Sequence, residues 1–479
     1  MEKTNEIKVA KGRKYTVDIT GLNHEGQGVG RIARFTVFIE GAIPGERVEA
    51  EIAMVKSNYC TASIARIIIA SDSRVESFCG VYGDCGGCSL QHIDYSRQLE
   101  LKTGIVKDAL QRIGKIDISN IVIHDTVGMS KPLHYRNKAQ YPVGPNYRSC
   151  TEKPGSGASG SDTEIVPAAI GFYSRMSHDI VDFRECAIHD KACDIVKEAV
   201  REFIKRHARE LSIYDEATGE GLIRHIAVRV GSKFGEVMAI IVINGRSLPR
   251  SDVLIRLLLK KVPRLKSVFL NINMEKSNII FGEKFIRLYG QAYIEDHIGK
   301  YVFRLSPASF YQVNPERMEY LYNKAIEFAG LTGTETVADI YCGIGTITLL
   351  LAEKAMKVYG IEVSEDAVKD ARLNASLNEV TNVEFICAEA EAGLEQLKEQ
   401  LDVIVLDPPR KGCAPELLNA AAGMMPEKII YISCNPSTLA RDLAILQEKG
   451  FRAVEVQPVD MFPHTAHVEV CCLLCRRRS

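Results

Sequence analysis

The C-terminal part of the chain alternates short apolar segments with helix-like segments, and this alternation constrains the fold more than any other feature. From about Tyr301 the apolar segments include TVADI, KVYGIE, VIVLD and KIIYIS. Segments that are apolar throughout are typical of strands in a parallel sheet covered by helices on both faces. The last segments, VEVQPV and HVEVCCLLC, predict two more strands as an antiparallel edge pair. Residues 301–479 are therefore expected to form a doubly wound α/β domain.

Two regions of different pattern precede this domain. Residues 1–70 contain short alternating runs broken by glycines, which predicts a small five-stranded, OB-like β-barrel. Residues 71–300 mix strand-like and helix-like segments, which predicts a central α+β domain. A Gly/Ser-rich tract at 153–164 predicts the mobile tip of a hairpin within it.

Composition and charge restrict the location and the partners. The formal net charge of -1 means that a nucleic acid would have to be bound by local basic patches rather than by a global field. The N-terminal segment lacks the apolar stretch of a signal peptide, and no run approaches the roughly 20 apolar residues of a membrane span. We therefore expect a cytoplasmic protein without membrane association, and no protein partner is predicted.

A glycine-containing loop follows the first strand of the expected α/β domain. TVADI runs into Tyr341, and Gly343 and Gly345 follow before a helix. Glycine permits such a turn and lets a ligand approach the backbone. Glu362 ends the next strand, where a carboxylate can accept hydrogen bonds from ribose hydroxyls. A dinucleotide site would need a third glycine where Thr348 stands, so a nucleoside without phosphates fits better.

Three further segments bring chemically useful groups to the same expected sheet edge. Asp407 begins the segment DPPR, Cys434 lies in SCNP, and Glu469 lies in the last strand region. Arg410 stands where enzymes that methylate exocyclic amines often carry an aromatic residue, so amine methylation is disfavoured. A thiolate that adds to C6 of uracil makes C5 nucleophilic toward a methyl sulfonium, and a base must then remove the C5 proton. Taken singly, the cysteine would more often be an inert buried thiol and the glutamate a surface carboxylate; together at one edge they favour this chemistry.

A separate group of cysteines lies near the start of the central region. Cys79, Cys85 and Cys88 fall within ten residues, and two glycines precede the last of them. In a reducing compartment such a group indicates metal binding more often than disulfides. The spacing alone allows either zinc or an iron–sulfur cluster. The candidates for a fourth ligand are Cys150, Cys186 and Cys193.

The motifs DIYCGIG, GIE, LDPPRKG, SCNP and PHTAHVE, preceded by SFYQVN, resemble those of the RNA uracil-C5 methyltransferases. The resemblance covers nearly the whole chain, and the N-terminal barrel is similar to a TRAM domain. Together with the cysteine group, it implies the iron–sulfur branch of the family, which acts mainly on large-subunit (23S) ribosomal RNA. The expected fold is thus a class I S-adenosylmethionine methyltransferase domain behind a central domain and a TRAM-like barrel.

The resemblance also assigns roles to residues. It implies Cys434 as nucleophile, Glu469 as base, and Cys186 as the fourth ligand of a [4Fe–4S] cluster, with zinc as the alternative. It implies that S-adenosylmethionine is contacted by Gln312, Tyr341, Glu362 and Asp407.

The expected substrate is a uridine flipped out of a loop or single-stranded region of 23S ribosomal RNA. Arg136 and Lys138 are RNA contacts by position only, and the stretch 197–209 is either another contact or a solvated helix face. A tRNA uracil-C5 methyltransferase is the alternative within the family, followed by a cytosine-C5 enzyme. An RNA-binding or assembly factor with a degenerate methyltransferase domain is the alternative from another class.

Overall fold

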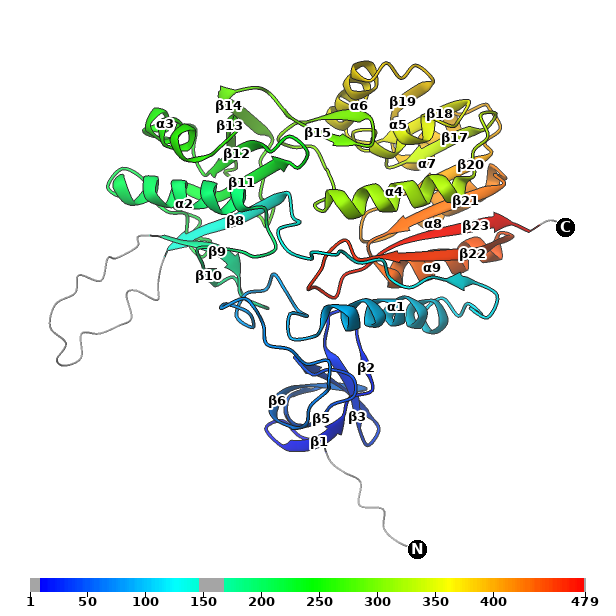
Figure 1. Cartoon of the computed structure of the whole chain (residues 1–479), viewed down its shortest axis with the longest axis horizontal. Coiled ribbons are helices and arrows are strands. Elements are labelled where there is room, and N and C mark those ends of the chain that lie inside the picture. The colour runs from blue at the N-terminus through cyan, green and yellow to red at the C-terminus, as the bar shows by residue number, and fades with distance from the viewer. Residues whose placement is uncertain (1–8, 146–167, 478–479) are drawn as a thin grey trace, which may run out of the picture.

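The computed structural model describes residues 9–145 and 168–477, which form three main sheets (Figure 1). The Gly/Ser-rich tract at 153–164 and Cys150 lie outside the described residues. Among the described residues, no helix combines the length and the apolar character needed to cross a bilayer.

The N-terminal sheet is a small barrel-like body of six strands in the order β1-β5-β6-β4-β3-β2, one more than predicted because the two-residue β2 takes part. A Cβ atom placed on Gly30 in β3 would lie 2.3 Å from Val17 Cγ1 in β1, so glycine lets these two strands approach closely. The strands are β1 (Lys14–Asp18), β2 (Gly21–Leu22), β3 (Gly28–Ile32), β4 (Phe35–Glu40), β5 (Arg47–Val55) and β6 (Tyr59–Ile69).

The central sheet has seven strands in the order β10-β9-β8-β11-β12-β13-β14. Helices α2 (Lys191–Arg206) and α3 (Ser251–Lys261) pack their apolar sides on one face of it. The strands are β8 (Lys138–Pro145), β9 (Ala168–Tyr173), β10 (Ile180–Asp182), β11 (Ile223–Gly231), β12 (Glu236–Ile243), β13 (Leu265–Ile272) and β14 (Lys284–Gly290). A hairpin of β15 (Ile294–Ile298) and β16 (Tyr301–Leu305) then leads into the C-terminal part.

The C-terminal sheet confirms the doubly wound α/β prediction. Its eight strands have the order β19-β18-β17-β20-β21-β23-β22-β7, and β17 to β21 are parallel. Its strands are β7 (Val122–Ile123), β17 (Thr336–Ile340), β18 (Lys357–Glu362), β19 (Val383–Cys387), β20 (Val403–Leu406), β21 (Lys428–Ser433), β22 (Phe451–Val459) and β23 (Glu469–Arg476).

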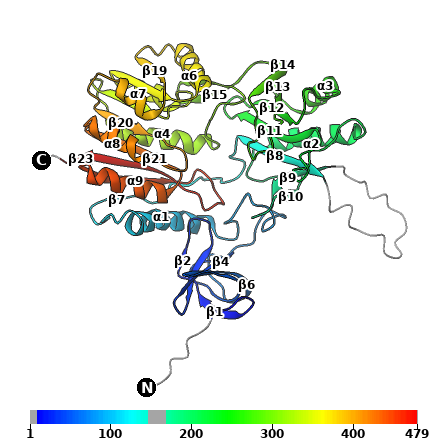
Figure 2. The same ribbon diagram turned by 180° about the vertical axis from the view of Figure 1, so that it is seen from behind.

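Helices cover both faces of this sheet. One face packs against α4 (Pro315–Ala329), α5 (Thr346–Ala352) and α6 (Glu365–Leu377). The other packs against α7 (Ala390–Gln396), α8 (Pro415–Gly423) and α9 (Pro436–Glu448), and also against α1 (Tyr95–Arg112). Helix α1 lies between the barrel and α9 in both views (Figures 1 and 2).

The last two strands are antiparallel as predicted, but the prediction that they form the edge is wrong. Strand β7 pairs in parallel with β22, with Val122 opposite Glu455, and therefore lies outside the pair. A two-residue strand has no periodicity from which it could be recognised. The division at 1–70, 71–300 and 301–479 remains a prediction, and within it α1 and β7 pack with the C-terminal sheet rather than with the central one.

Candidate active site

Four of the parallel strands, namely β17, β18, β20 and β21, carry the predicted residues where they end at one edge of the C-terminal sheet. Tyr341, Asp407 and Cys434 follow three of these strands directly, and Glu362 is the last residue of β18. Strand β23 is antiparallel to β21, so its first residue, Glu469, starts at the same edge. Ser433 pairs with Val470, and the next position of this register sets Cys434 beside Glu469.

The glycine loop after β17 fits a nucleoside. Tyr341 has a positive φ of 68°, and its N–H donates to Ile361 O at 2.9 Å, which turns the chain sharply at the strand end. The Glu362 carboxylate accepts hydrogen bonds from Gly343 N at 3.2 Å and from Ser364 N at 2.8 Å, so its position is fixed. A Cβ atom on Gly343 would meet no heavy atom within 4 Å, so the space above the loop is open to a ligand.

Gln312 lies on the loop between β16 and α4. Its side chain is buried, and its backbone oxygen accepts a hydrogen bond from Asn137 Nδ2 at 3.1 Å. Two residues later, Asn314 caps α4 by accepting from Arg317 N at 3.3 Å. The loop that carries Gln312 is thus held from the central region and from the helix that covers the sheet.

The acidic groups and the thiol at the edge influence one another. Burial raises the pKa of Glu469 to about 8, and the neighbouring Asp407 contributes to this rise. Burial also raises the pKa of Asp407 to about 7 and that of Cys434 to about 11, the latter with a contribution from Glu469. Arg410 acts in the opposite direction on the pKa of both Cys434 and Glu469. Arg410 is therefore the cation of the site, a role that its sequence position did not reveal.

The loop that carries Arg410 is attached to the start of α9, directly after Cys434. Arg410 O accepts hydrogen bonds from Asn435 Nδ2 at 3.3 Å and from Thr438 Oγ1 at 3.4 Å. The Cys413 N–H donates to Asp442 in α9 at 2.8 Å. These contacts fix the two loops relative to each other, and with them the thiol and the guanidinium.

Cys434 lies on the wall of a large cleft of about 1200 Å³. The cleft is lined by all parts of the molecule: His24 and Thr61 of the barrel, the segment 86–89 of the cysteine group, Arg136 and Arg175 of the central region, and Arg410, Cys434, Phe462 and His467 of the C-terminal part. Of the two proposed RNA contacts in HYRNK, Arg136 lines this cleft, whereas Lys138 is not among its lining residues.

Lys138 and Lys197 are less accessible than a simple RNA contact would be. Burial and the nearby Arg229 lower the pKa of Lys138 to about 7. Lys197 is buried and donates to Phe183 O at 2.6 Å and to Arg184 O at 2.8 Å. The interpretation of 197–209 as a surface stretch is thus wrong for Lys197, because its long side chain folds inward from α2.

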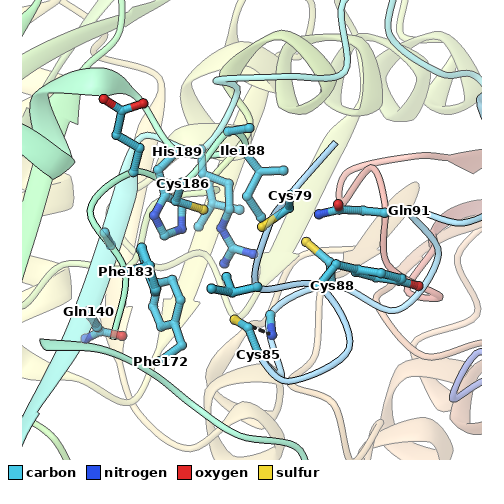
Figure 3. Close-up of a pocket in the computed structure, with 18 of the residues that line it drawn as sticks. Cys79, Cys85, Cys88, Gln91, Gln140, Phe172, Phe183, Cys186, Ile188 and His189 are labelled. Atoms are coloured by element: carbon cyan, nitrogen blue, oxygen red, sulfur yellow. Dashed lines mark hydrogen bonds between the residues drawn. The ribbon is translucent and has the colours of Figure 1, made fainter. Parts of the chain in front are cut away.

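Four thiols line a second cavity of about 310 Å³, shown in Figure 3. The segment 79–93, called here the cysteine loop, precedes α1 and carries three of the thiols. Within it, Gly87 N donates to Cys85 Sγ at 3.4 Å. Burial raises the pKa of Cys88 to about 12 and that of Cys186 to about 11, and the neighbouring thiols add to both shifts. The four are Cys79, Cys85, Cys88 and Cys186, whereas Cys193 is not among the residues that line this cavity.

Within residues 9–145 and 168–477, no group of three or more histidine, cysteine, aspartate or glutamate side chains is close enough to hold one metal ion.

Comparison with known proteins assigns the class. Residues 264–477 match the model of the tRNA (Uracil-5-)-methyltransferase family, and residues 8–65 match the TRAM domain. A solved structure with a TM-score of 0.73 and 27% identity covers 96% of this chain and 100% of its own: the Pyrococcus abyssi tRNA (uracil-54, C5)-methyltransferase in complex with S-adenosyl-L-homocysteine. The fold and the edge residues thus define an S-adenosylmethionine-dependent RNA methyltransferase.

Relatives that match over almost their whole length show the family to which the chain belongs. An uncharacterized RNA methyltransferase of Caldanaerobacter subterraneus is 48% identical over 98% of this chain and 99% of its own. One of Clostridium tetani is 43% identical over 98% of each chain. The chain belongs to the RNA uracil-C5 methyltransferase family, with a TRAM domain at its N-terminus.

Proposed function

We propose that this protein methylates C5 of a uridine in 23S ribosomal RNA through a transient covalent bond between Cys434 and C6 of the base. The observation that carries the proposal is the strand register that sets Cys434 beside Glu469, at the edge that holds the glycine loop, with Cys434 on the wall of a large cleft. A uridine flipped into this cleft would meet the nucleophile and the base at one point.

Cys434 acts first. Its thiolate adds to C6, and the C5–C6 π electrons move toward O4, which leaves an enolate with nucleophilic character at C5. A thiol with a pKa of about 11 is mostly protonated at neutral pH, so it gives its proton to water before it adds to C6. The guanidinium of Arg410 lowers the pKa of the thiol and so favours this step.

The donor would be held at the glycine loop by Glu362, whose carboxylate Gly343 N and Ser364 N fix in place, and by Asp407 at the neighbouring strand end. S-adenosylmethionine supplies an electrophilic methyl group when bound. C5 takes this methyl group and becomes tetrahedral, with both the methyl group and its original hydrogen attached.

Glu469 completes the reaction. Its ionised carboxylate takes the C5 proton, the electrons of the C5–H bond form the C5–C6 double bond, and the S–C6 bond breaks to return the Cys434 thiolate. A raised pKa suits this role, because a carboxylate in a buried site is a stronger base than one in water.

The second part of the proposal is that the four cysteines hold a [4Fe–4S] cluster, with zinc as the alternative. It is supported by the resemblance to the iron–sulfur branch and by the four thiols lining one cavity. Cys79, Cys85, Cys88 and Cys186 would hold the cluster. The methylation consumes no electrons, so the cluster would serve to order the loop beside the cleft.

Iron and sulfide analysis of anaerobically purified protein, with a visible absorption spectrum, tests the cluster. We expect about four irons per chain, as the cluster formula requires. If the analysis finds stoichiometric zinc and no iron, the site binds zinc and the cluster proposal is wrong.

The choice of ribosomal RNA rests on the resemblance of the cysteine group to the iron–sulfur branch of the family. The tRNA alternative is supported by the solved tRNA (uracil-54, C5)-methyltransferase, which covers 96% of this chain and so extends over the TRAM region. The test is methylation of separate rRNA and tRNA pools with a tritiated donor, followed by nucleoside analysis. We expect 5-methyluridine in the 23S fraction. Label in tRNA alone would support the tRNA alternative, label in cytidine the cytosine-C5 alternative, and no label the degenerate assembly factor.

A further inference from the structure

The segment 460–468, called here the base segment, connects β22 to β23 and delivers Glu469 to the sheet edge. It contains no helix or strand and lines part of the cleft through Phe462 and His467. A base at the end of such a segment needs external contacts to keep its carboxylate in place, because an error of about 1 Å in position can cost about 100-fold in rate.

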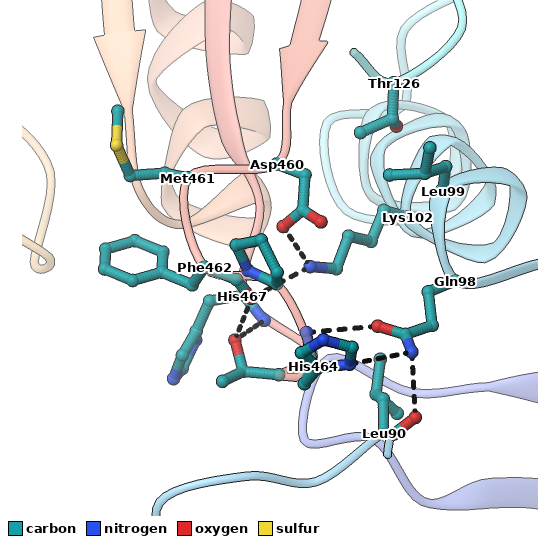
Figure 4. A network of polar contacts seen from close by, with 12 residues as sticks. Leu90, Gln98, Leu99, Lys102, Thr126, Asp460, Met461, Phe462, His464 and His467 are labelled. Atoms are coloured by element: carbon teal, nitrogen blue, oxygen red, sulfur yellow. Dashed lines mark hydrogen bonds and ion pairs between the residues drawn. The ribbon is translucent and has the colours of Figure 1, made fainter. Parts of the chain in front are cut away.

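Gln98 in α1 joins this segment to the end of the cysteine loop. The side chain of Gln98 is fully buried, and Figure 4 shows its contacts with Leu90 and His464. Its Nε2 donates to Leu90 O at 3.0 Å and to Ile93 O at 2.9 Å, while its Oε1 accepts from His464 N at 3.1 Å. One amide thus holds the end of the cysteine loop and the middle of the base segment together.

The cysteine loop also contacts the base segment directly. The N–H groups of Ser89 and Leu90 donate to His464 O at 3.0 and 2.9 Å, and Ser89 Oγ accepts from Ala466 N at 3.0 Å. Ser89 directly follows Cys88, whose thiol lines the cysteine cavity. The path from that cavity to the base segment is therefore one peptide bond and a pair of hydrogen bonds.

A second contact from α1 anchors the beginning of the base segment. Lys102 and Asp460 are both fully buried and form an ion pair of 2.5 Å. Lys102 Nζ also donates to Phe462 O at 3.2 Å, and Tyr95 OH donates to Asp460 Oδ2 at 2.9 Å.

The middle of the segment has contacts of its own. Asn314 Nδ2 donates to Met461 O at 3.2 Å, and Tyr135 OH donates to Pro463 O at 3.1 Å. Gln98 accepts from His464 N.

We propose that Gln98 is a positioning residue that couples the order of the cysteine loop to the aim of the Glu469 carboxylate. The inference deepens the proposed function and rests on it for the role of Glu469. Without the amide, Leu90 O, Ile93 O and His464 N would each lose a buried hydrogen-bond partner, and the cysteine loop would be joined to the base segment more loosely, through the direct hydrogen bonds of Ser89 and Leu90.

Gln98→Leu tests the proposal, with Gln111→Leu as the matched control because Gln111 is exposed on the same helix. In single-turnover assays with tritiated donor, we expect Gln98→Leu to form the covalent RNA adduct at the control rate and to release methylated RNA about 10- to 100-fold more slowly. The adduct would accumulate on denaturing gels, and KM for RNA would stay unchanged. Equal slowing of adduct formation and release, or release at the control rate, would overturn the proposal.

Amide hydrogen exchange provides a second readout that does not depend on the chemistry. We expect faster exchange across residues 460–469 in Gln98→Leu than in Gln111→Leu, and faster exchange at Ala466 in Ser89→Ala. Unchanged exchange in all variants would contradict the coupling even in an enzyme that methylates RNA. Absence of any adduct in the wild-type protein, with the exchange difference present, would reject the covalent mechanism and retain the coupling.

Discussion

At the scale of single residues, the Arg410 guanidinium acts on the thiol of Cys434 and the carboxyl group of Glu469. Burial, Glu469 and Asp407 each raise the pKa of Cys434, and Arg410 opposes them. The thiol and the base would therefore each favour the neutral form in the empty site. The thiol must therefore release its proton to water before it adds to C6, and Glu469 must lose its own proton before its carboxylate can accept the C5 proton.

Glu469→Gln should trap the enzyme on its RNA. The amide cannot accept the C5 proton, so the methylated adduct cannot release Cys434, and we expect a covalent RNA–protein species that survives a denaturing gel. Cys434→Ala should form no such species and should lower turnover by at least about 10⁴-fold. Near-normal turnover in Cys434→Ala would contradict the covalent mechanism.

The release step should depend on pH through Glu469. Its pKa of about 8 means that the carboxylate fraction grows as the pH rises through that value. The rate of adduct breakdown should therefore increase about tenfold between pH 7 and pH 9 and then level off. Stopped-time assays that start from the preformed adduct measure this step alone, and a rate that falls over the same interval would argue against Glu469 as the base.

At the scale of elements, α1 connects parts that lie far apart in the sequence. It packs on α9 with its apolar side and reaches the base segment with buried polar groups. At the active edge, the ends of parallel strands meet the start of the antiparallel strand β23. Helix α1 lies beside that edge, although its position in the chain would assign it to the central region.

Lys102→Ala should destabilise the protein by about 3 to 5 kcal/mol, because it leaves Asp460 buried and without its cation. Lys107→Ala on the exposed side of the same helix should change stability by less than about 0.5 kcal/mol. Urea unfolding followed by circular dichroism measures both variants. Similar losses in the two variants would mean that the buried pair is not an anchor.

At the scale of the whole molecule, the barrel, the cysteine loop, the central region and the C-terminal part all line one cleft. The formal net charge of -1 gives no general attraction to RNA, so binding must depend on cations placed at the cleft, such as Arg136, Arg175 and Arg410.

Arg136→Ala should weaken RNA binding and lower the slope of log K against log salt by about one unit if its guanidinium meets a phosphate. Arg256→Ala, on the exposed side of α3, serves as the control. Filter binding at several salt concentrations measures the slope. An unchanged slope in Arg136→Ala would indicate a contact to a base or to the protein itself.

The sequence by itself determined the type of sheet and the residues at its active edge. Apolar runs separated by helices specify parallel strands, and the residue that follows each run must lie at the carboxyl edge, so the local pattern already places Tyr341, Asp407 and Cys434 together. The spacing of Cys79, Cys85 and Cys88 indicated a metal site, and the family resemblance added Cys186 and the roles of Cys434 and Glu469, which remain predictions. The placement at the sheet edge could be predicted because it depends on local periodicity.

Only the tertiary structure decided which distant segments meet. The pairing of β7 with β22, the inward turn of Lys197, the cationic role of Arg410 and the bridge made by Gln98 all depend on contacts between residues far apart in the chain. No periodicity encodes such contacts, because a buried polar side chain finds its partner only after both elements have packed. The local sequence thus determined which side chains lie at the sheet edge. The packing of α1 and the cysteine loop against the base segment determined which contacts fix their positions.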